Sequence, residues 1–303
     1  MVKPASLGDK PKPMLHAGGG VAASSYFTVN IGCEAGINHL KSALGLLIKE
    51  SLSLNRTPIV FTPRFLATHN FDKAVDASWG KYIDLSRIVI TKDGATHYVE
   101  AVEEDAIVNR DALTVLEVKG KHLITPAENA AYRVIVKNNP SGLGLDAVYT
   151  HDEFDFNVEF LPSRAVRHHA DQVWRRLGEY HAMHVRRGDM LAEKARCPNL
   201  AEDTRPEKIL ETLSRVLAKG ARVYVLTDEQ DRNYFEILKQ DYQIFRYFDF
   251  PELKAFVEGD HPDNFFLYEI EKLIFANAHT KIHTFAHPKG ETRISLTSDL
   301  GWS

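Results

Sequence analysis

The sequence predicts an α/β protein with two domains, and three observations support this prediction. The chain has 303 residues, about twice the length of a typical domain, and 44% of them are hydrophobic, which is enough for two cores. Its second half alternates strand-like runs with segments of helical periodicity, a pattern typical of a parallel sheet with helical crossovers. Its first half opens with a strand-like run, a glycine and a long amphipathic segment.

The first predicted domain covers residues 25–163 and follows a flexible leader at 1–24. Tyr26–Ile31 is an aromatic and β-branched run that stops at Gly32, which indicates a buried strand entering a turn. Apolar residues at 37–54 recur every three or four positions, so this segment is predicted to be a helix. Further strands are expected at 59–61, 87–90 and 132–136.

The second predicted domain covers residues 164–303 and begins with a helix at 164–178, where apolar residues again have helical spacing. Strands are expected at 180–185, 222–226, 243–247 and 281–285, and helices at 206–217, 229–238 and 264–276. Because ligands of such sheets bind beyond the carboxyl ends of the strands, we look for functional residues there.

Composition and charge exclude several classes of protein. The chain carries 37 Lys and Arg against 41 Asp and Glu, a net charge of −4, so it has no overall attraction for nucleic acid. Cys33 and Cys197 alone form neither a disulfide framework nor a zinc cluster, which favours a reducing compartment. The apolar run Ala43–Ile48 is far shorter than the ~20 residues of a membrane span. We therefore expect a cytoplasmic protein.

The most informative motif is His184–Asp189, at the end of a predicted strand. Two guanidiniums, those of Arg186 and Arg187, follow the strand next to Gly188, which lets the backbone turn. Such a pair offers a rigid, multidentate site for a diphosphate. A second interpretation stays open: a local ion pair between Arg187 and Asp189 with Arg186 in solvent. Display of Arg-Gly-Asp as an adhesion motif is disfavoured, because three residues often occur by chance and a buried strand precedes them.

Other polar residues follow the remaining strands. Asp228 directly follows a strand, where it either contacts a ligand or caps the next helix. Glu269 and Glu271 stand two positions apart on a predicted helix and point in different directions, so at most one of them faces a cleft. Thr284 and Phe285 end the last predicted strand, where they serve either core packing or ligand contact.

The chain contains 14 histidines but no His-Glu-x-x-His motif. It also lacks Asp-x-Asp, the acidic pair that holds a divalent cation against a nucleotide diphosphate. If a diphosphate binds, arginines rather than a metal ion must balance its charge.

Five stretches are similar to motifs of the superfamily of α1,2-, α1,6- and protein O-fucosyltransferases. These are Ile31–Asn38, Arg56–Val60, His184–Asp189, Val223–Asp228 and Glu269–Phe285. The resemblance implies a GT-B fold, in which two Rossmann-like domains face each other across a donor and acceptor cleft. It also implies GDP-fucose as the donor substrate and no metal cofactor.

The resemblance further implies roles for individual residues. Arg186 would bind the β-phosphate and stabilise the departing GDP, with Arg187 assisting. His184 would contact the guanine, and Glu269 would accept hydrogen bonds from guanine N1 and N2. The other implied donor-site residues are Gly36, Asn38, Asp189, Asp228, Thr284 and Phe285.

An inverting transfer requires the acceptor hydroxyl to attack from the face opposite GDP, with a base on that side. Glu34 is the implied base, in a stretch that resembles the Glu-Gly-Phe-Asn of one branch of protein O-fucosyltransferases with one residue inserted. Where the family's terminal motif continues with serines, this chain has Ala286 and His287. We expect an inverting, metal-independent transferase that moves L-fucose to a hydroxyl of a glycan, lipid-linked sugar or protein.

Three other functions are considered. A related donor such as GDP-rhamnose would use the same contacts with guanine and diphosphate. An inactive relative would bind GDP-sugar or glycan without turnover. A dinucleotide oxidoreductase is disfavoured, because no Gly-x-Gly-x-x-Gly follows a predicted strand. Nothing in the sequence resembles the anchor, stem or SH3-like appendage of animal Golgi enzymes, so a bacterial or viral source is expected.

Overall fold

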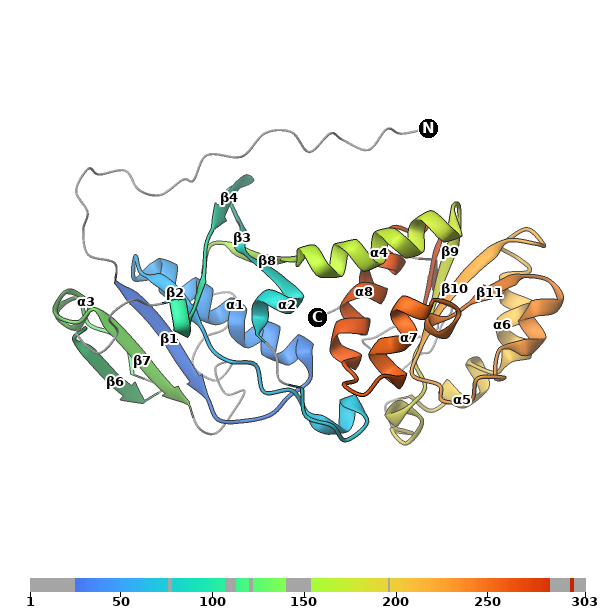
Figure 1. Cartoon of the computed structure of the whole chain (residues 1–303), viewed down its shortest axis with the longest axis horizontal. Helices are drawn as coiled ribbons and strands as arrows, with labels where there is room; N and C mark the ends of the chain where they lie inside the picture. Colours follow the sequence, from blue (N-terminus) through green and yellow to red (C-terminus); the bar gives the residue numbers. More distant parts are fainter. Residues whose placement is uncertain are drawn as a thin grey trace. The chain divides into compact units, whose positions relative to one another are not determined.

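A computed structural model describes residues 25–75, 78–106, 113–119, 122–139, 154–195, 197–283 and 295–296. This part of the chain divides into two compact units between Ser163 and Arg164 (Figure 1). The segment Ala67–Val75 belongs to the second unit although it precedes most of the first unit's strands. The predicted leader at 1–24 lies outside the described residues.

The first unit is built on a five-stranded parallel sheet with the order β5-β2-β1-β7-β6. Its strands are β1 (Tyr26–Ile31), β2 (Thr57–Val60), β5 (Val102–Glu103), β6 (Val115–Lys119) and β7 (Val134–Asn139). Helix α1 (Ile37–Ser53) connects β1 to β2, and the short α3 (Pro126–Ala131) precedes β7. The predicted strand at the start of the chain and the helix after it are thus present, with the helix one residue shorter.

A second, antiparallel sheet of the first unit has the order β4-β3-β8. It comprises β3 (Ile83–Lys92), β4 (Ala95–Val99) and β8 (Asn157–Pro162), and the short helix α2 (Trp79–Tyr82) leads into it. Helix α1 packs against β1 and β2 and also against β8, so most of its side chains are buried. No helix within the described residues, α1 included, combines the length and apolar character needed to cross a bilayer.

Arg56 ties several ends of the first unit together. The side chain is 4% exposed and lies between α1 and β2. Its guanidinium donates to the carbonyl oxygens of Tyr26, Asn129, Tyr132 and Arg133 and to the side-chain oxygen of Asn129. A buried cation is tolerated here because its N–H donors are satisfied by backbone acceptors.

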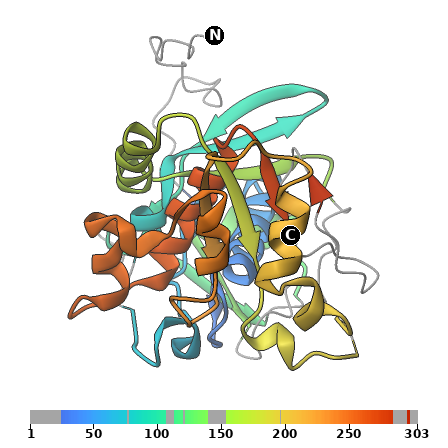
Figure 2. The same cartoon turned by 90° about the vertical axis from the view of Figure 1, so that its right-hand side faces the viewer.

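The second unit contains a five-stranded sheet with the order β11-β10-β9-β12-β13, parallel except for β13. Its strands are β9 (His181–Val185), β10 (Arg222–Thr227), β11 (Gln243–Phe245), β12 (Lys281–His283) and β13 (Ser295–Leu296). Its helices include α4 (Arg164–Leu177), α5 (Leu200–Asp203), α6 (Pro206–Leu213), α7 (Pro251–Glu258) and α8 (Asn264–Ala276). Figure 2 shows α7 and α8 on one side of this sheet and α6 on the other.

Apolar side chains on both faces of the sheet form the core of the second unit. On the α6 face, strand residues such as Val185 and Val225 pack against Ile209 and Leu213. On the other face, α8 packs against β9 and β10. Two Rossmann-like units, each with a mostly parallel sheet and helical crossovers, confirm the predicted α/β class.

The predicted α-helix at 229–238 is wrong. The chain there forms turns followed by a 3₁₀ segment, Glu236–Gln240. The carboxylate of Glu229 accepts from the amide of Asp231, and the carboxylate of Asp231 accepts from the amide of Asn233. These local bonds compete with helical hydrogen bonding, so the segment stays a loop.

Candidate functional site

A cavity of about 190 Å³ lies at the carboxyl ends of β9 and β10 in the second unit. Its walls come from the ends of these strands, the loop after β10, residues 246–247, helices α7 and α8, and Phe71 of the Ala67–Val75 segment. Pockets for whole small ligands have volumes of roughly 300–1,000 Å³. This cavity is therefore large enough for one ring system rather than for a complete sugar nucleotide.

Arg186 lines the cavity and is held by two carboxylates. Its Nη1 contacts Oδ2 of Asp228, and its Nη2 lies 2.5 Å from Oδ1 of Asp189. Its side chain is 35% exposed. A guanidinium has five N–H donors, so these two contacts leave capacity for a bound anion.

Asp228 fixes the turn that follows β9. In addition to Arg186, its carboxylate accepts from the backbone amide of Arg187 at 2.7 Å. Gly188, with φ of 21°, lies so close that a Cβ there would collide with the Asp228 carboxylate. Of the two sequence interpretations of Asp228, helix capping does not apply, because turns follow it rather than an α-helix.

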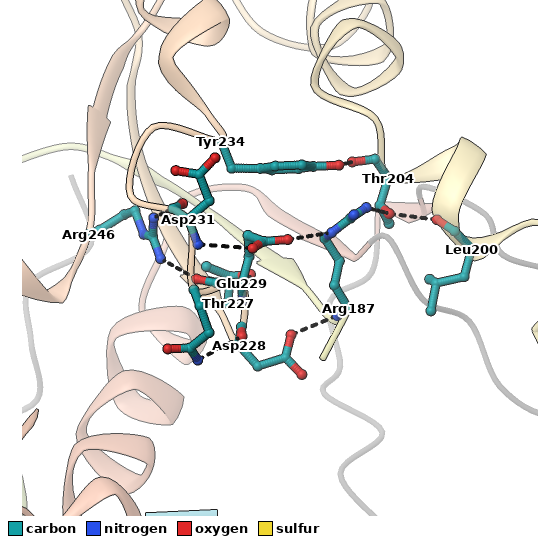
Figure 3. A network of polar contacts seen from close by, with 10 residues as sticks. Arg187, Leu200, Thr204, Thr227, Asp228, Glu229, Asp231, Tyr234 and Arg246 are labelled. Carbon is teal, nitrogen blue, oxygen red and sulfur yellow. Dashed lines mark hydrogen bonds and ion pairs between the residues drawn. The ribbon is translucent and has the colours of Figure 1, made fainter. Parts of the chain in front are cut away.

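Arg187 does not line the cavity and belongs to a separate polar network, drawn in Figure 3. Its Nε donates to Glu229 at 2.8 Å, its Nη1 donates to Oγ1 of Thr204 at 2.5 Å, and its guanidinium lies 4.3 Å from the ring centre of Tyr234. Asp189, the partner considered for it, instead pairs with Arg186. Arg187 thus braces the loop after β10 from the side away from the cavity.

Arg246 holds the same loop from the other side (Figure 3). Its Nη2 donates to the carbonyl oxygen of Glu229 at 2.8 Å, and its Nη1 donates to that of Asp231 at 3.2 Å. Burial alone would raise the pKa of Glu229, but hydrogen bonds from the Asp231 amide and from Arg187 outweigh it and lower the pKa. Arg246 also lines the cavity, and its buried Nε has no hydrogen-bond partner within the described part of the chain.

The carboxylate that α8 presents to the cavity is that of Glu271. Burial raises the pKa of Glu271 to about 7, against the opposing effects of a hydrogen bond from Tyr224 and of the charge of Arg246. Glu269, the residue implied by the resemblance, is 4% exposed, does not line the cavity and lies 3.8 Å from Nζ of Lys272.

The helical spacing of α8 explains why Glu271 lines the cavity and Glu269 does not. Asn264, Leu267, Tyr268 and Glu271 all line the cavity and follow the steps of three and four residues that define one helix face. Glu269 lies outside that series. The expectation that only one of the two glutamates faces the cleft agrees with this arrangement.

His184 also lines the cavity, at the end of β9. Its ring centre lies 5.9 Å from that of His283 in an edge-to-face arrangement. Burial, with the neighbouring His283 and Arg186, lowers the pKa of His184 to about 3. The imidazole is therefore neutral near pH 7, with one nitrogen as donor and the other as acceptor.

Three predicted residues belong to the first unit. Glu34 follows β1, and its carboxylate lies 3.9 Å from Nη2 of Arg64, with both side chains about half exposed. Gly36 precedes the first residue of α1, and Asn38 lies in its first turn. Thr284 and Phe285 lie outside the described residues. Within the described ranges, no three His, Cys, Asp or Glu side chains gather in a metal-binding arrangement.

The second unit thus carries a polar cavity at the carboxyl ends of its parallel strands, and comparison with known proteins gives similarities in structure alone. No family model and no curated protein matches the chain. In structure it is similar to POFUT1 in complex with GDP, with a TM-score of 0.49 and 12% identity over 85% of this chain and 96% of that one.

The chain is also similar to a second group of solved fucosyltransferases. For NodZ α-1,6-fucosyltransferase soaked with GDP-fucose, the TM-score is 0.44 and the identity 9% over 90% of this chain and 99% of that one. For fucosyltransferase NodZ from Bradyrhizobium, the TM-score is 0.40 and the identity 9% over 86% and 96%. The likeness is one of architecture, and residue roles do not follow from it.

Proposed function

We propose that this chain is a glycosyltransferase that uses a GDP-sugar, with GDP-fucose as the donor. The observation that carries the proposal is that Arg186 and Glu271 line one cavity at the carboxyl ends of β9 and β10. A guanidinium is suited to a diphosphate, and a half-buried carboxylate is suited to a base with adjacent N–H donors. Guanine has two such adjacent donors, the N1–H and the N2 amino group.

Other groups in the cavity support a placement with the diphosphate at Arg186 and the base at Glu271. The Arg246 guanidinium lines the cavity and places a positive charge near Glu271, which favours the ionised carboxylate. Neutral His184 supplies one donor and one acceptor. In this proposal Glu271 takes the role that the sequence resemblance implied for Glu269.

In the proposed reaction, the bond between the anomeric carbon and the β-phosphate oxygen breaks, and its electron pair stays on that oxygen. Arg186 stabilises the negative charge that develops on the departing GDP. The acceptor hydroxyl attacks from the opposite face, which inverts the anomeric centre, and Glu34 takes its proton. Because Arg186 supplies the countercharge, EDTA should leave the rate unchanged.

Calorimetric titration with GDP, UDP, ADP and CMP tests the nucleotide. We expect GDP to bind at least tenfold more tightly than the other three. Equal binding of UDP would contradict the assignment of guanine. Release of GDP from GDP-fucose without acceptor then tests turnover, because an inactive relative would bind the donor and leave it intact.

A second candidate differs only in the sugar. The cavity of about 190 Å³ accommodates the base, so the sugar extends beyond it and is not selected by these residues. GDP-rhamnose or another GDP-deoxyhexose would use the same contacts. Comparing release of GDP from GDP-fucose and from GDP-rhamnose distinguishes the two donors, while the acceptor is sought among glycans, lipid-linked sugars and proteins.

A further inference from the structure

The segment Ala67–Val75 is firmly anchored in the second unit. The side chain of Asn70 is fully buried. Its Nδ2 donates to the carbonyl oxygens of Pro262 at 3.0 Å and Lys73 at 2.9 Å, and its Oδ1 accepts from the amide of Asn264 at 2.8 Å. The side chain of Asn264 in turn donates to the carbonyl oxygen of His69 at 2.9 Å. The loop is therefore fixed against the start of α8.

The residue after this anchor has an unusual backbone. Phe71 and Asp72 have φ of 56° and 58°, in the left-handed region that bulky side chains seldom adopt. Such conformations persist where the surroundings impose them, and they often mark functional positions. Here the two residues directly follow the anchored Asn70.

The conformation leaves an aromatic ring beside the cavity. Phe71 lines the cavity, yet its side chain is 43% exposed, so the strain does not serve to bury the ring in a core. Val257 and Leu267 add apolar surface to the same cavity, and Glu271 adds a carboxylate. An exposed aromatic face next to apolar walls and a polar group is suited to a flat, partly polar ring.

We propose that Phe71 packs face to face on the base of the bound nucleotide and sets its affinity. This inference rests on the proposed function, because it takes the ligand of the cavity to be GDP. The residue reaches the site from a segment that precedes most of the first unit, far from the Arg186 motif in sequence. When alanine replaces an aromatic residue that stacks on a base, affinity typically falls by about tenfold.

Calorimetry with GDP and with inorganic pyrophosphate tests the role. We expect Phe71→Ala to weaken GDP binding about tenfold and to leave pyrophosphate binding unchanged, since pyrophosphate has no base. Val216→Ala is the matched control, because Val216 is 38% exposed in the same unit and does not line the cavity. It should bind GDP as the wild type does.

The outcomes separate the two proposals. Wild-type GDP affinity in a folded Phe71→Ala variant, or equal losses for GDP and pyrophosphate, would overturn the role of Phe71 and leave the proposed function standing. Failure of the wild-type protein to bind GDP would overturn both.

A fluorescence measurement covers the case in which Phe71→Ala does not fold. In Phe71→Trp, GDP should quench the emission of the new indole, because the base would stack on it. The control Val216→Trp should show no added quenching. Equal responses in the two variants would overturn the stacking.

Discussion

The hydroxyl of Tyr224 donates a hydrogen bond to the carboxylate of Glu271, with 2.9 Å between the two oxygen atoms. Tyr224 is fully buried in β10, and Glu271 lines the cavity from α8. The bond favours the charged carboxylate, whereas burial favours the protonated one, and together with Arg246 they leave its pKa at about 7. The charge of the proposed base-binding group therefore changes across the neutral range.

This relationship makes GDP affinity depend on pH. If ionised Glu271 accepts from guanine, affinity should fall as the pH drops below about 7. Tyr224→Phe removes a hydrogen bond to the charged form, so it should move this midpoint upward by about one pH unit. Calorimetric titrations from pH 5.5 to 9 would measure the shift.

Tyr242→Phe is a matched control for that experiment. Tyr242 is also buried, and its hydroxyl has no hydrogen-bond partner among the described residues. Its loss should leave the midpoint unchanged. The other charged side chains that line the cavity are those of Arg186, Asp228, Glu229 and Arg246. His184 also lines it, and its pKa of about 3 lies below this pH range. Equal midpoints for the two variants would argue against the link to Glu271.

The free energy of unfolding should also depend on the charge of Glu271, but it should fall as the pH rises, whereas GDP affinity should increase. Folding raises the pKa of Glu271 from 4.5 to about 7, so the folded state binds its proton more tightly, and stability is lost as the pH rises through this interval. Glu271→Gln should therefore be more stable than the wild type at pH 8, by on the order of 2 kcal/mol, and should match it at pH 4.5. Urea unfolding at both pH values would measure this, and a gain that persists at low pH would contradict it.

The adjacent arginines should behave differently. Arg186→Ala should abolish transfer with little change in the free energy of unfolding, because the side chain is 35% exposed. Arg187→Ala should cost about 2–4 kcal/mol, because it leaves the nearly buried Glu229 carboxylate without its cation and removes the contact with Tyr234. Urea unfolding and donor hydrolysis on both variants would test the contrast. Similar losses of stability in the two would refute it.

Gly188→Ala should disturb the site through Asp228. The added Cβ would displace the Asp228 carboxylate, which holds both Arg186 and the amide of Arg187. Together with a φ of 21°, this should lower stability by about 1–3 kcal/mol and weaken GDP binding. Gly220→Ala is a useful comparison: its φ is also positive, at 82°, but its added Cβ would meet no atom within 4 Å. It should lose stability without losing GDP affinity.

Glu34→Gln should separate chemistry from donor binding. Glu34 belongs to the first unit, so its loss should leave GDP affinity as in the wild type. If it takes the acceptor proton, the transfer rate should fall by 10²- to 10⁴-fold. Transfer assays with saturating GDP-fucose, beside calorimetry with GDP, would measure both quantities. An unchanged rate would remove Glu34 as the base.

Local patterns predicted the regular part of the fold well. Helix α8 lies at its expected residues, 264–276, because its apolar periodicity and the Asp263 cap act within the segment. The antiparallel pairing of β3 with β8 was not predicted, since the two strands lie far apart in sequence. The pairing of β3 with β4 is a local hairpin through Asp93 and Gly94, and this turn signal was missed. The loop after β10 was expected as a helix because side-chain bonds to nearby amides do not appear in apolar spacing.

The site could be predicted where its residues lie at or just after the end of a strand. His184 and Arg186 at the end of β9, and Asp228 directly after β10, were predicted and line the cavity. Arg187 was assigned to the diphosphate, but its guanidinium contacts Glu229, Thr204 and Tyr234. These contacts depend on the tertiary fold, so the sequence alone does not reveal them. Phe71 lies more than a hundred residues earlier in a segment of ordinary composition, and tertiary folding alone brings it to the cavity.

The placement of Ala67–Val75 also limits how the protein can be divided. A fragment that starts at Arg164 would lack Asn70, so the Pro262 carbonyl and the Asn264 amide would lose their partners. A peptide with the sequence of 67–75, supplied in trans, should bind such a fragment and raise its melting temperature. For protein engineering, the second unit is thus a discontinuous module, and a truncated or exchanged version of it must include the segment Ala67–Val75.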